Sequence, residues 1–244
     1  MARITAIINQ KGGVGKTTTA TTLASGLKLR GYRVLVIDAD PQGNCSYIMK
    51  AARQHGTSDL LKGKPIMQLI QHVDQADIIS SSDDLVGADR AFSDLSLLKN
   101  ALRPVLGMYD HIIIDCPPAT GIITFNALTA ASDVVVPVGA NVLSLQGLGQ
   151  LFESVAQVKQ HSNRDLKIAG LLICRKNGRA VLTKQFTEAI EEVAQQQRVR
   201  LYQQTIRESV AICEAQALQE SIFNTHRKAA VTADYAAFID EYLK

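Results

Sequence analysis

The sequence lacks tryptophan and contains only six tyrosines and six phenylalanines. Its core must therefore be built mainly from aliphatic side chains. A hydrophobic content of 46% over 244 residues is nevertheless enough for one α/β domain with a large core. The chain shows no repeat, linker or low-complexity segment, so we expect a single domain over residues 1–244.

Cysteines and long apolar runs are scarce as well. The four cysteines lie far apart and form no C-x-x-C pair: Cys45, Cys116, Cys174 and Cys213. This pattern fits reduced thiols and argues against a disulfide framework, a zinc site or a metal cluster. No apolar run is long enough for a transmembrane helix, and no signal-like segment precedes the first motif. We therefore expect a soluble, cytoplasmic protein.

A large excess of one charge is also missing, because the net charge is only +3. The distribution is uneven, however. Residues 159–207 hold ten Lys and Arg against four Asp and Glu, a local balance of +6, and the remainder is slightly acidic. Such a segment indicates either an anionic partner or an ordinary solvated surface.

What the sequence does contain is a glycine-rich turn between a predicted strand and a predicted helix. An apolar run from Ile4 to Ile8 indicates a buried strand, and a helical pattern runs from Thr17 to Arg30. Between them lies Asn9-Gln10-Lys11-Gly12-Gly13-Val14-Gly15-Lys16-Thr17-Thr18. Glycines let backbone N–H groups approach phosphate oxygens, and the helix N-terminus adds positive potential. Lys16 can reach the β- and γ-phosphates and the Thr17 hydroxyl can bind Mg²⁺, so we predict a phosphate site rather than a turn that binds nothing.

Aspartates leave two further predicted strands at their carboxyl ends. Strand 33–38 is followed by Asp-Ala-Asp-Pro-Gln-Gly-Asn, and strand 109–115 ends in Asp-Cys-Pro-Pro. Parallel sheets bind ligands at these ends, so Asp38, Asp40 and Asp115 should lie near the Mg²⁺ and the γ-phosphate. Asp115 has the Walker B arrangement for binding Mg²⁺ directly or through water. An ordinary Asp-Pro turn is the alternative for the first segment.

Strands and helices alternate over the rest of the chain. This alternation predicts a doubly wound, mainly parallel sheet flanked by helices, with the topology of a P-loop NTPase. The expected elements after residue 115 are helix 122–131, strand 133–138, helix 143–158, strand 168–174, helix 181–196, a short strand near 201–204 and helix 229–243. The less informative stretch 45–107 predicts short helices at 57–61 and 66–73, a short strand at 77–80 and a helix at 95–106.

The glycine-rich turn departs from the plain P-loop pattern, which would need glycine where the chain has Gln10. Instead it has a second lysine, Lys11. The run Lys-Gly-Gly-Val-Gly-Lys-Thr-Thr resembles the deviant Walker A motif of the ParA, MinD and nitrogenase iron protein group. Residues 38–44 resemble the Walker A′ segment of ParA proteins. The resemblance implies that Lys11 crosses a dimer interface to the partner's nucleotide, that Asp40 orients or activates the attacking water, and that Asp38 supports the metal site.

The resemblance holds in order and spacing from Met1 to about Val158 and is looser beyond. ParA proteins commonly have Ile-Pro-Arg-Asn-Val-Arg-Leu-Ser-Glu-Ala-Pro where this chain has Ile-Arg-Glu-Ser-Val-Ala-Ile-Cys-Glu-Ala-Gln at 206–216. The match implies nucleotide contacts from Arg207, Glu208 and Ser209, while a DNA-binding arginine of the family is replaced by Ala211. Another such arginine is matched by Arg179. With the basic segment, we expect DNA contacts from Arg175, Lys176, Arg179, Arg198 and Arg200.

These features predict an Mg-ATP-dependent ATPase of the ParA type that dimerises with ATP and partitions plasmid, mobile-element or chromosomal DNA. The predicted catalytic residues are Lys11, Lys16 and Asp40. Mg²⁺ would be held by Thr17, Asp38 and Asp115, and ATP by Lys11, Gly12, Gly13, Val14, Gly15, Lys16, Thr17, Thr18, Arg207, Glu208 and Ser209. The implied partners are non-specific DNA, with nucleoid association, and a ParB-like adaptor; no membrane is expected.

Three alternatives stay open at this point. A MinD-like membrane regulator would need a basic, bulky amphipathic helix at its C-terminus, whereas residues 235–244 mix acidic with apolar side chains. A metal-cluster carrier or reductase would need converging cysteines. A ParA relative that positions a cargo other than DNA is compatible with every motif.

Overall fold

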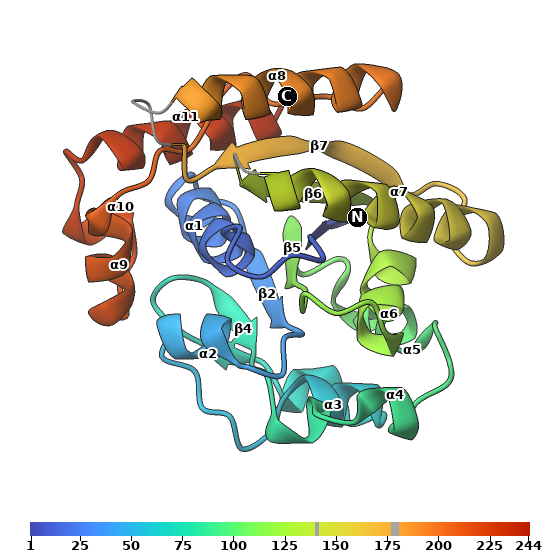
Figure 1. Ribbon diagram of the computed structural model, residues 1–244. Helices are drawn as coiled ribbons and strands as arrows, with labels where there is room; N and C mark the ends of the chain where they lie inside the picture. Colours follow the sequence, from blue (N-terminus) through green and yellow to red (C-terminus); the bar gives the residue numbers. More distant parts are fainter. Residues whose placement is uncertain (140–141, 177–180) are drawn as a thin grey trace.

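A seven-stranded sheet forms the middle layer of the computed structural model, which describes residues 1–139, 142–176 and 181–244 (Figure 1). The strands lie in the order β3-β4-β2-β5-β1-β6-β7. In that order their bounds are Gln71–His72, Asp77–Ile79, Val34–Asp38, His111–Asp115, Arg3–Ile7, Asp133–Gly139 and Lys167–Cys174. Each neighbouring pair among these strands is parallel except β3 and β4. The predicted doubly wound, mainly parallel sheet is confirmed.

The central strands are apolar along their length because both faces of the sheet are covered. In β5, Ile112 and Ile114 join one core cluster and Ile113 joins the other. In β1, Ile4 and Ile7 likewise belong to different clusters. The continuous aliphatic runs in the sequence therefore reflect burial on two sides of the sheet. They supply most of the core in a chain that has few aromatic residues.

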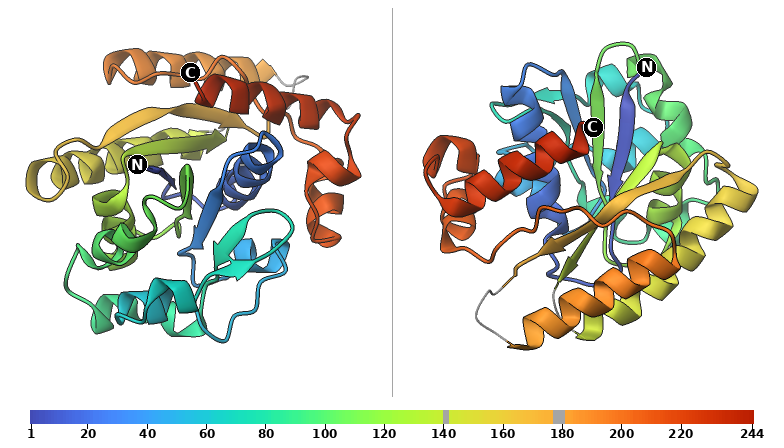
Figure 2. Two further views of the ribbon diagram at one scale, coloured as in Figure 1. Left: turned by 180° about the vertical axis from the view of Figure 1, so that it is seen from behind. Right: turned by 90° about the horizontal axis from the view of Figure 1, so that it is seen from above.

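Two layers of helices enclose the sheet. One layer contains α3 (Thr57–Leu61), α4 (Ala88–Ala91), α5 (Leu97–Leu102), α6 (Ile122–Ala130), α7 (Val142–His161) and α8 (Val181–Gln196). The other contains α1 (Lys16–Leu29), α2 (Asn44–Ile48), α9 (Val210–Ala217), α10 (Ile222–Thr225) and α11 (Ala230–Tyr242). Seen from above, α7 and α8 lie side by side, and α11 lies on the other side of β7 (Figure 2). The chain therefore winds both ways from β1, which places the β1–α1 turn at the centre of one sheet edge.

Two sequence predictions are wrong. Residues 66–73 do not form one helix: a 3₁₀ turn at Ile66–Gln68 is followed by β3, where the Gln71 side chain exchanges two 2.8 Å hydrogen bonds with the backbone of Ala52. Residues 201–204 form no strand, only a bridge between Leu201 and Leu171. The Tyr202 N–H still donates to the Leu171 carbonyl, but the N–H groups of Gln203 and Gln204 donate to the Glu241 carboxylate, so a side chain takes the place of a strand partner.

The C-terminal helix α11 packs into the core. Tyr235, Phe238 and Tyr242 are each at most 1% exposed and belong to the core cluster that also holds residues of α1 and β7. The Tyr242 hydroxyl lies 2.7 Å from the Thr5 hydroxyl of β1. The prediction of a packed terminal helix is confirmed. No helix in the described part of the chain is long and apolar enough to cross a membrane. Further 3₁₀ turns lie at Asp83–Leu85 and Arg103–Val105.

Candidate nucleotide-binding site

The turn between β1 and α1 is shaped to wrap an anion. Gly13 and Gly15 have φ angles of 73° and 96°, in the left-handed region that favours glycine. A Cβ at Gly12 would meet no atom within 4 Å, so the backbone there is open to a ligand. Asn9 fixes the start of the turn, since it accepts the Lys11 N–H at 2.9 Å and donates to the Pro137 carbonyl at 2.8 Å. The backbone is therefore held in place before any ligand binds.

Lys16 lies at the base of this turn, where α1 begins. It is only 7% exposed, and its Nζ donates to the Lys11 carbonyl at 3.0 Å. Burial lowers the pKa of Lys16, and the nearby carboxylates of Asp115 and Asp40 oppose that shift. The ammonium group thus lies between the turn and two acidic groups, where it can bind a phosphate whose charge would oppose the lowering of the Lys16 pKa.

The Asp115 carboxylate has the properties expected of a metal ligand. It is fully buried, and neither of its carboxylate oxygens has a hydrogen-bond partner within the described residues. Burial raises the pKa of Asp115 well above its usual range; Asp38 raises it further, and the neighbouring Thr17 hydroxyl acts in the opposite direction. Buried carboxylate oxygens rarely stay without partners. A hard divalent cation bound by Asp115 and Thr17 would satisfy them, so the residues fit Mg²⁺.

Asp38 lies beside Asp115, because the two residues are register partners at the carboxyl ends of β2 and β5. Its carboxylate accepts hydrogen bonds from the Ser46 N–H at 2.7 Å, the Ser46 hydroxyl at 2.6 Å and the Asp40 N–H at 3.2 Å. Burial raises the pKa of Asp38 to about 6, although these hydrogen bonds lower it. Mg²⁺ would therefore be held directly by Asp115 and Thr17, while Asp38 shapes the segment that carries Asp40.

Asp40 faces the same space from the end of β2. It is 7% exposed, and it lines the cavity together with Lys16 and Thr17. Its side chain accepts the Gln42 N–H at 3.0 Å, and its carbonyl accepts the Ser81 hydroxyl at 2.6 Å. Because the backbone on both sides is fixed, the carboxylate can hold a water in a defined direction.

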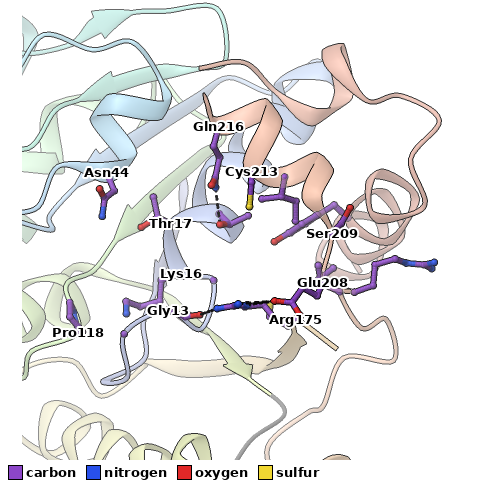
Figure 3. A pocket seen from close by; sticks show the side chains of 18 of the residues that line it. Gly13, Lys16, Thr17, Asn44, Pro118, Arg175, Glu208, Ser209, Cys213 and Gln216 are labelled. Carbon is purple, nitrogen blue, oxygen red and sulfur yellow. Dashed lines mark hydrogen bonds and ion pairs between the residues drawn. The ribbon is translucent and has the colours of Figure 1, made fainter. Parts of the chain in front are cut away.

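These groups open into a cavity of about 480 Å³ (Figure 3). The phosphate-binding turn forms one wall, and the segment before α9 together with α9 forms the other. The second wall brings Ile206, Ile212 and Cys213, which are mainly apolar, and Arg207, Glu208 and Ser209, for which the family resemblance had implied nucleotide contacts. Tyr235 of α11 lines the cavity as well. A cavity with an anion-binding wall and an apolar wall suits a nucleotide, with phosphates on the first and the base on the second.

The residues predicted to bind DNA do not form one surface. Arg175 lines the cavity instead, and Arg200 pairs with Glu241 at 2.9 Å beside the middle of β7. Arg198 is exposed just beyond the far end of α8, and Lys176 lies next to Arg175. Arg179 lies outside the described residues. The described members of this set therefore lie at separate positions before and after α8 in the chain, and their part in DNA binding stays a prediction.

Sequence reasoning missed two residues of the site. Arg175 follows a buried parallel strand directly, which is the same signal that identified the aspartates. Arg53 gave no signal at all: it comes from a weakly patterned stretch, yet it donates to the Pro41 carbonyl at 3.0 Å beside Asp40.

Comparison with known proteins agrees with this geometry. The model of an AAA-domain family matches residues 2–168. The sporulation initiation inhibitor protein Soj of Bacillus subtilis is 41% identical over 225 residues, covering 88% of each chain. The chromosome partitioning protein ParA of Myxococcus xanthus is 34% identical over 100% of this chain and 89% of its own. The chain belongs to the ParA family of partition ATPases.

Solved structures show the same fold for this ParA-family chain. Cobyrinic acid a,c-diamide synthase from Mycobacterium smegmatis with bound ADP and magnesium superposes with a TM-score of 0.86 at 29% identity, covering 100% of this chain and 94% of the other. That relative is named for a different activity. Similarity of fold alone therefore does not determine which activity the nucleotide site of a ParA-family chain supports.

Proposed function

We propose that this ParA-family ATPase binds Mg-ATP in the cavity, dimerises in that state, and partitions DNA that it binds without sequence preference. A ParB-like adaptor bound to DNA would stimulate hydrolysis. The observation that carries the proposal is Asp115, a buried carboxylate with two unpartnered oxygens beside Lys16 and Thr17. A metal-bound polyphosphate accounts for all three groups together.

Each residue has a task in hydrolysis. The backbone at Gly12–Gly15 and the Lys16 ammonium bind phosphate oxygens, and Thr17 and Asp115 hold the metal, with Asp38 behind them. When bound, Mg²⁺ neutralises charge on the phosphate oxygens. Asp40 orients the attacking water and accepts its proton. Lys11 adds charge to the partner's site. This division of work fits phosphoryl transfer, which depends on positioning and charge more than on covalent steps.

DNA is the proposed cargo because the relatives are named for chromosome partitioning. No recognition motif was found in the sequence, so contacts to backbone phosphates are expected. Among the predicted DNA contacts in the described part of the basic segment, Lys176, Arg198 and Arg200 do not line the cavity, and Arg200 pairs with Glu241. Lys176 and Arg198 are therefore the candidates, together with Arg179 from the sequence prediction. One subunit would make few contacts, and an ATP-bound dimer would double them.

The first test is ATP hydrolysis by the parent protein and by Asp40→Ala. We expect slow turnover by the parent, about 10²-fold less by the variant, and similar Mg-ATP affinity of both, because the carboxylate acts on water rather than on phosphate. Lys16→Ala should lose nucleotide binding. Turnover by Asp40→Ala at the parental rate would remove this carboxylate from the mechanism.

The cargo is tested by titrating random-sequence duplex DNA with and without Mg-ATP at two salt concentrations. Affinity should rise with ATP and fall steeply with salt, since each neutralised phosphate releases counterions. A Lys176→Ala/Arg179→Ala variant should bind more weakly and with a shallower salt dependence. Failure of the parent to bind DNA in the presence of ATP would favour a ParA relative with a different cargo.

A further inference from the structure

Arg175 reaches across the nucleotide cavity to the phosphate-binding turn. It follows β7 and has a φ of 56°, an uncommon backbone conformation for a residue with a side chain. Its Nη1 donates to the Gly13 carbonyl at 3.0 Å. Its Nη2 and Nε donate to Glu208 Oε1 at 2.7 and 3.3 Å. Gly13, Arg175 and Glu208 thus form a row along one side of the cavity (Figure 3).

The guanidinium has bonding capacity left. An arginine has five N–H donors, and three are used in these contacts, which leaves one on each terminal nitrogen. The Arg175 and Glu208 side chains are 59% and 52% exposed. Solvent screens so exposed an ion pair, which therefore adds little to stability. The guanidinium can leave Glu208 easily when a stronger anion enters the cavity.

The other cations of the cavity are committed elsewhere. Lys16 lies at the base of the turn, on the Lys11 carbonyl. Arg207 makes two side-chain hydrogen bonds to Asp234, at 2.6 and 2.8 Å, and that carboxylate is only 6% exposed. Among the described cations that line the cavity, Arg175 is thus the one without a buried partner, and it already touches the backbone of the turn between β1 and α1.

We infer that Arg175 binds the phosphates of the nucleotide and that Glu208 holds it beside the site until the nucleotide enters. The inference rests on the proposed function, because it assumes a nucleotide in this cavity. A phosphate group carries more charge than a carboxylate and accepts two parallel N–H bonds from a guanidinium. Glu208 competes for the same donors and repels the phosphates. The two partners of one ion pair therefore act on nucleotide affinity in opposite directions.

The test is calorimetric titration with Mg-ATP, Mg-ADP and adenosine. Arg175→Ala should bind Mg-ATP about tenfold more weakly, the equivalent of one charge-assisted hydrogen bond. Glu208→Gln should bind it a few-fold more tightly, because it removes the competing charge. Arg175→Lys, which keeps the charge without the fork, should lie between parent and Arg175→Ala. The effects should persist with ADP and vanish with adenosine, which has no phosphate.

Two controls separate the possible outcomes. Arg33→Ala removes a similarly exposed pair, with Asp110, at the opposite end of β2, and it should leave affinity unchanged. Lys16→Ala reports on the cavity itself. Parental affinity in both Arg175 variants overturns the inference, and so does equal weakening by Arg175→Ala and Glu208→Gln, which a purely structural pair would give. Absence of Mg-ATP binding by the parent overturns the proposed function instead.

Discussion

At the scale of single residues, the buried carboxylates of the site lower the stability of the native state. Asp38 and Asp115 are buried side by side on neighbouring strands; burial raises the pKa of both carboxyls, and the charge of Asp38 raises that of Asp115 further. Two like charges in a low-dielectric environment are unfavourable, and Lys16 offsets them only in part. A metal ion bound to the native state alone would add to stability by mass action. The site is therefore expected to be most strained before nucleotide and metal bind.

This strain predicts an unusual dependence of stability on pH. The pKa of Asp38 is raised to about 6, so in the range between its ordinary value and 6 the native state binds more protons than the unfolded state. The free energy of unfolding should accordingly fall as pH rises to about 6 and then level off as far as Asp38 is concerned; Asp115, whose pKa is also raised, extends the fall to higher pH. Asp115→Asn should raise that free energy by about 1–2 kcal/mol at neutral pH and flatten the dependence. Denaturant unfolding from pH 4.5 to 8 in a chelator, without nucleotide, measures both.

Asp110 provides a matched control, because it lies just before the amino end of β5, the strand that ends in Asp115. Asp110 is hydrogen-bonded to Arg33, which lowers the pKa of that exposed carboxyl to about 2. Asp110→Asn should leave the slope above pH 4.5 unchanged, since Asp110 stays ionised in both states there. An identical pH profile for parent and Asp115→Asn would show that the buried pair does not govern stability.

At the scale of elements, Arg53 fixes the segment that follows β2. Its Nη2 donates to the Pro41 carbonyl at 3.0 Å and to Asp83 at 2.9 Å. The guanidinium also lies against Gly43, whose φ is 67°, so a Cβ at that glycine would collide with it. Arg53 is thereby packed against the turn that carries Asp40. Arg53 does not line the cavity, so we expect it to affect hydrolysis only through the position of that turn.

We predict that Arg53→Ala lowers the rate of ATP hydrolysis about tenfold while the affinity for Mg-ATP stays within twofold, because a small misplacement of a catalytic group affects the chemical step more than binding. Gly43→Ala should have the same effect, since the added methyl group displaces the guanidinium. Steady-state kinetics measures the rate of hydrolysis, and calorimetry measures the affinity for Mg-ATP. Arg103→Ala, a change in a 3₁₀ turn that does not line the cavity, is the control. Parental turnover by both Arg53→Ala and Gly43→Ala would contradict the positioning role.

The same segment shows how far the sequence could be interpreted. Strands β1, β2 and β5 were predictable because burial on both faces leaves an aliphatic run, and the motif residues follow those runs directly. Arg53 and the segment at 66–73 were not, because there the conformation depends on side-chain contacts with residues distant in the sequence, such as Gln71 with Ala52. Helix α9 was missed for a related reason: it is short, and of its residues only Ala215 is buried. Its one local signal is the N-cap, Ser209, whose hydroxyl accepts the Ala211 N–H.

At the scale of the whole molecule, the polar groups of the site gather at one edge of the sheet, while the basic segment is divided by α8. The sequence located the first because each motif lies at a strand end, and parallel strands end at the same edge. For the second, charge counted along a chain does not say which side of a helix or strand carries it, so the DNA contacts stay a prediction. Arg200 is compensated by Glu241, forty-one residues away.

Dimerisation is the property of the whole molecule that the cavity makes testable. Both polar groups of the Lys11 backbone are hydrogen-bonded: its N–H donates to the Asn9 side chain, and its carbonyl accepts a hydrogen bond from Lys16 Nζ. The start of its side chain is thus held at the edge of the cavity, and the family resemblance implies that it reaches the partner's nucleotide.

In the Asp40→Ala background, which should retain ATP, Mg-ATP should convert monomer to dimer in sedimentation. Adding Lys11→Ala should weaken that dimer at least tenfold without changing nucleotide affinity, because a buried cation facing a phosphate of the other subunit would be lost. Lys11→Arg keeps the charge and should restore part of the association. A monomer with and without Mg-ATP in the Asp40→Ala protein would refute ATP-driven dimerisation, and a dimer unaffected by Lys11→Ala would remove that lysine from the interface.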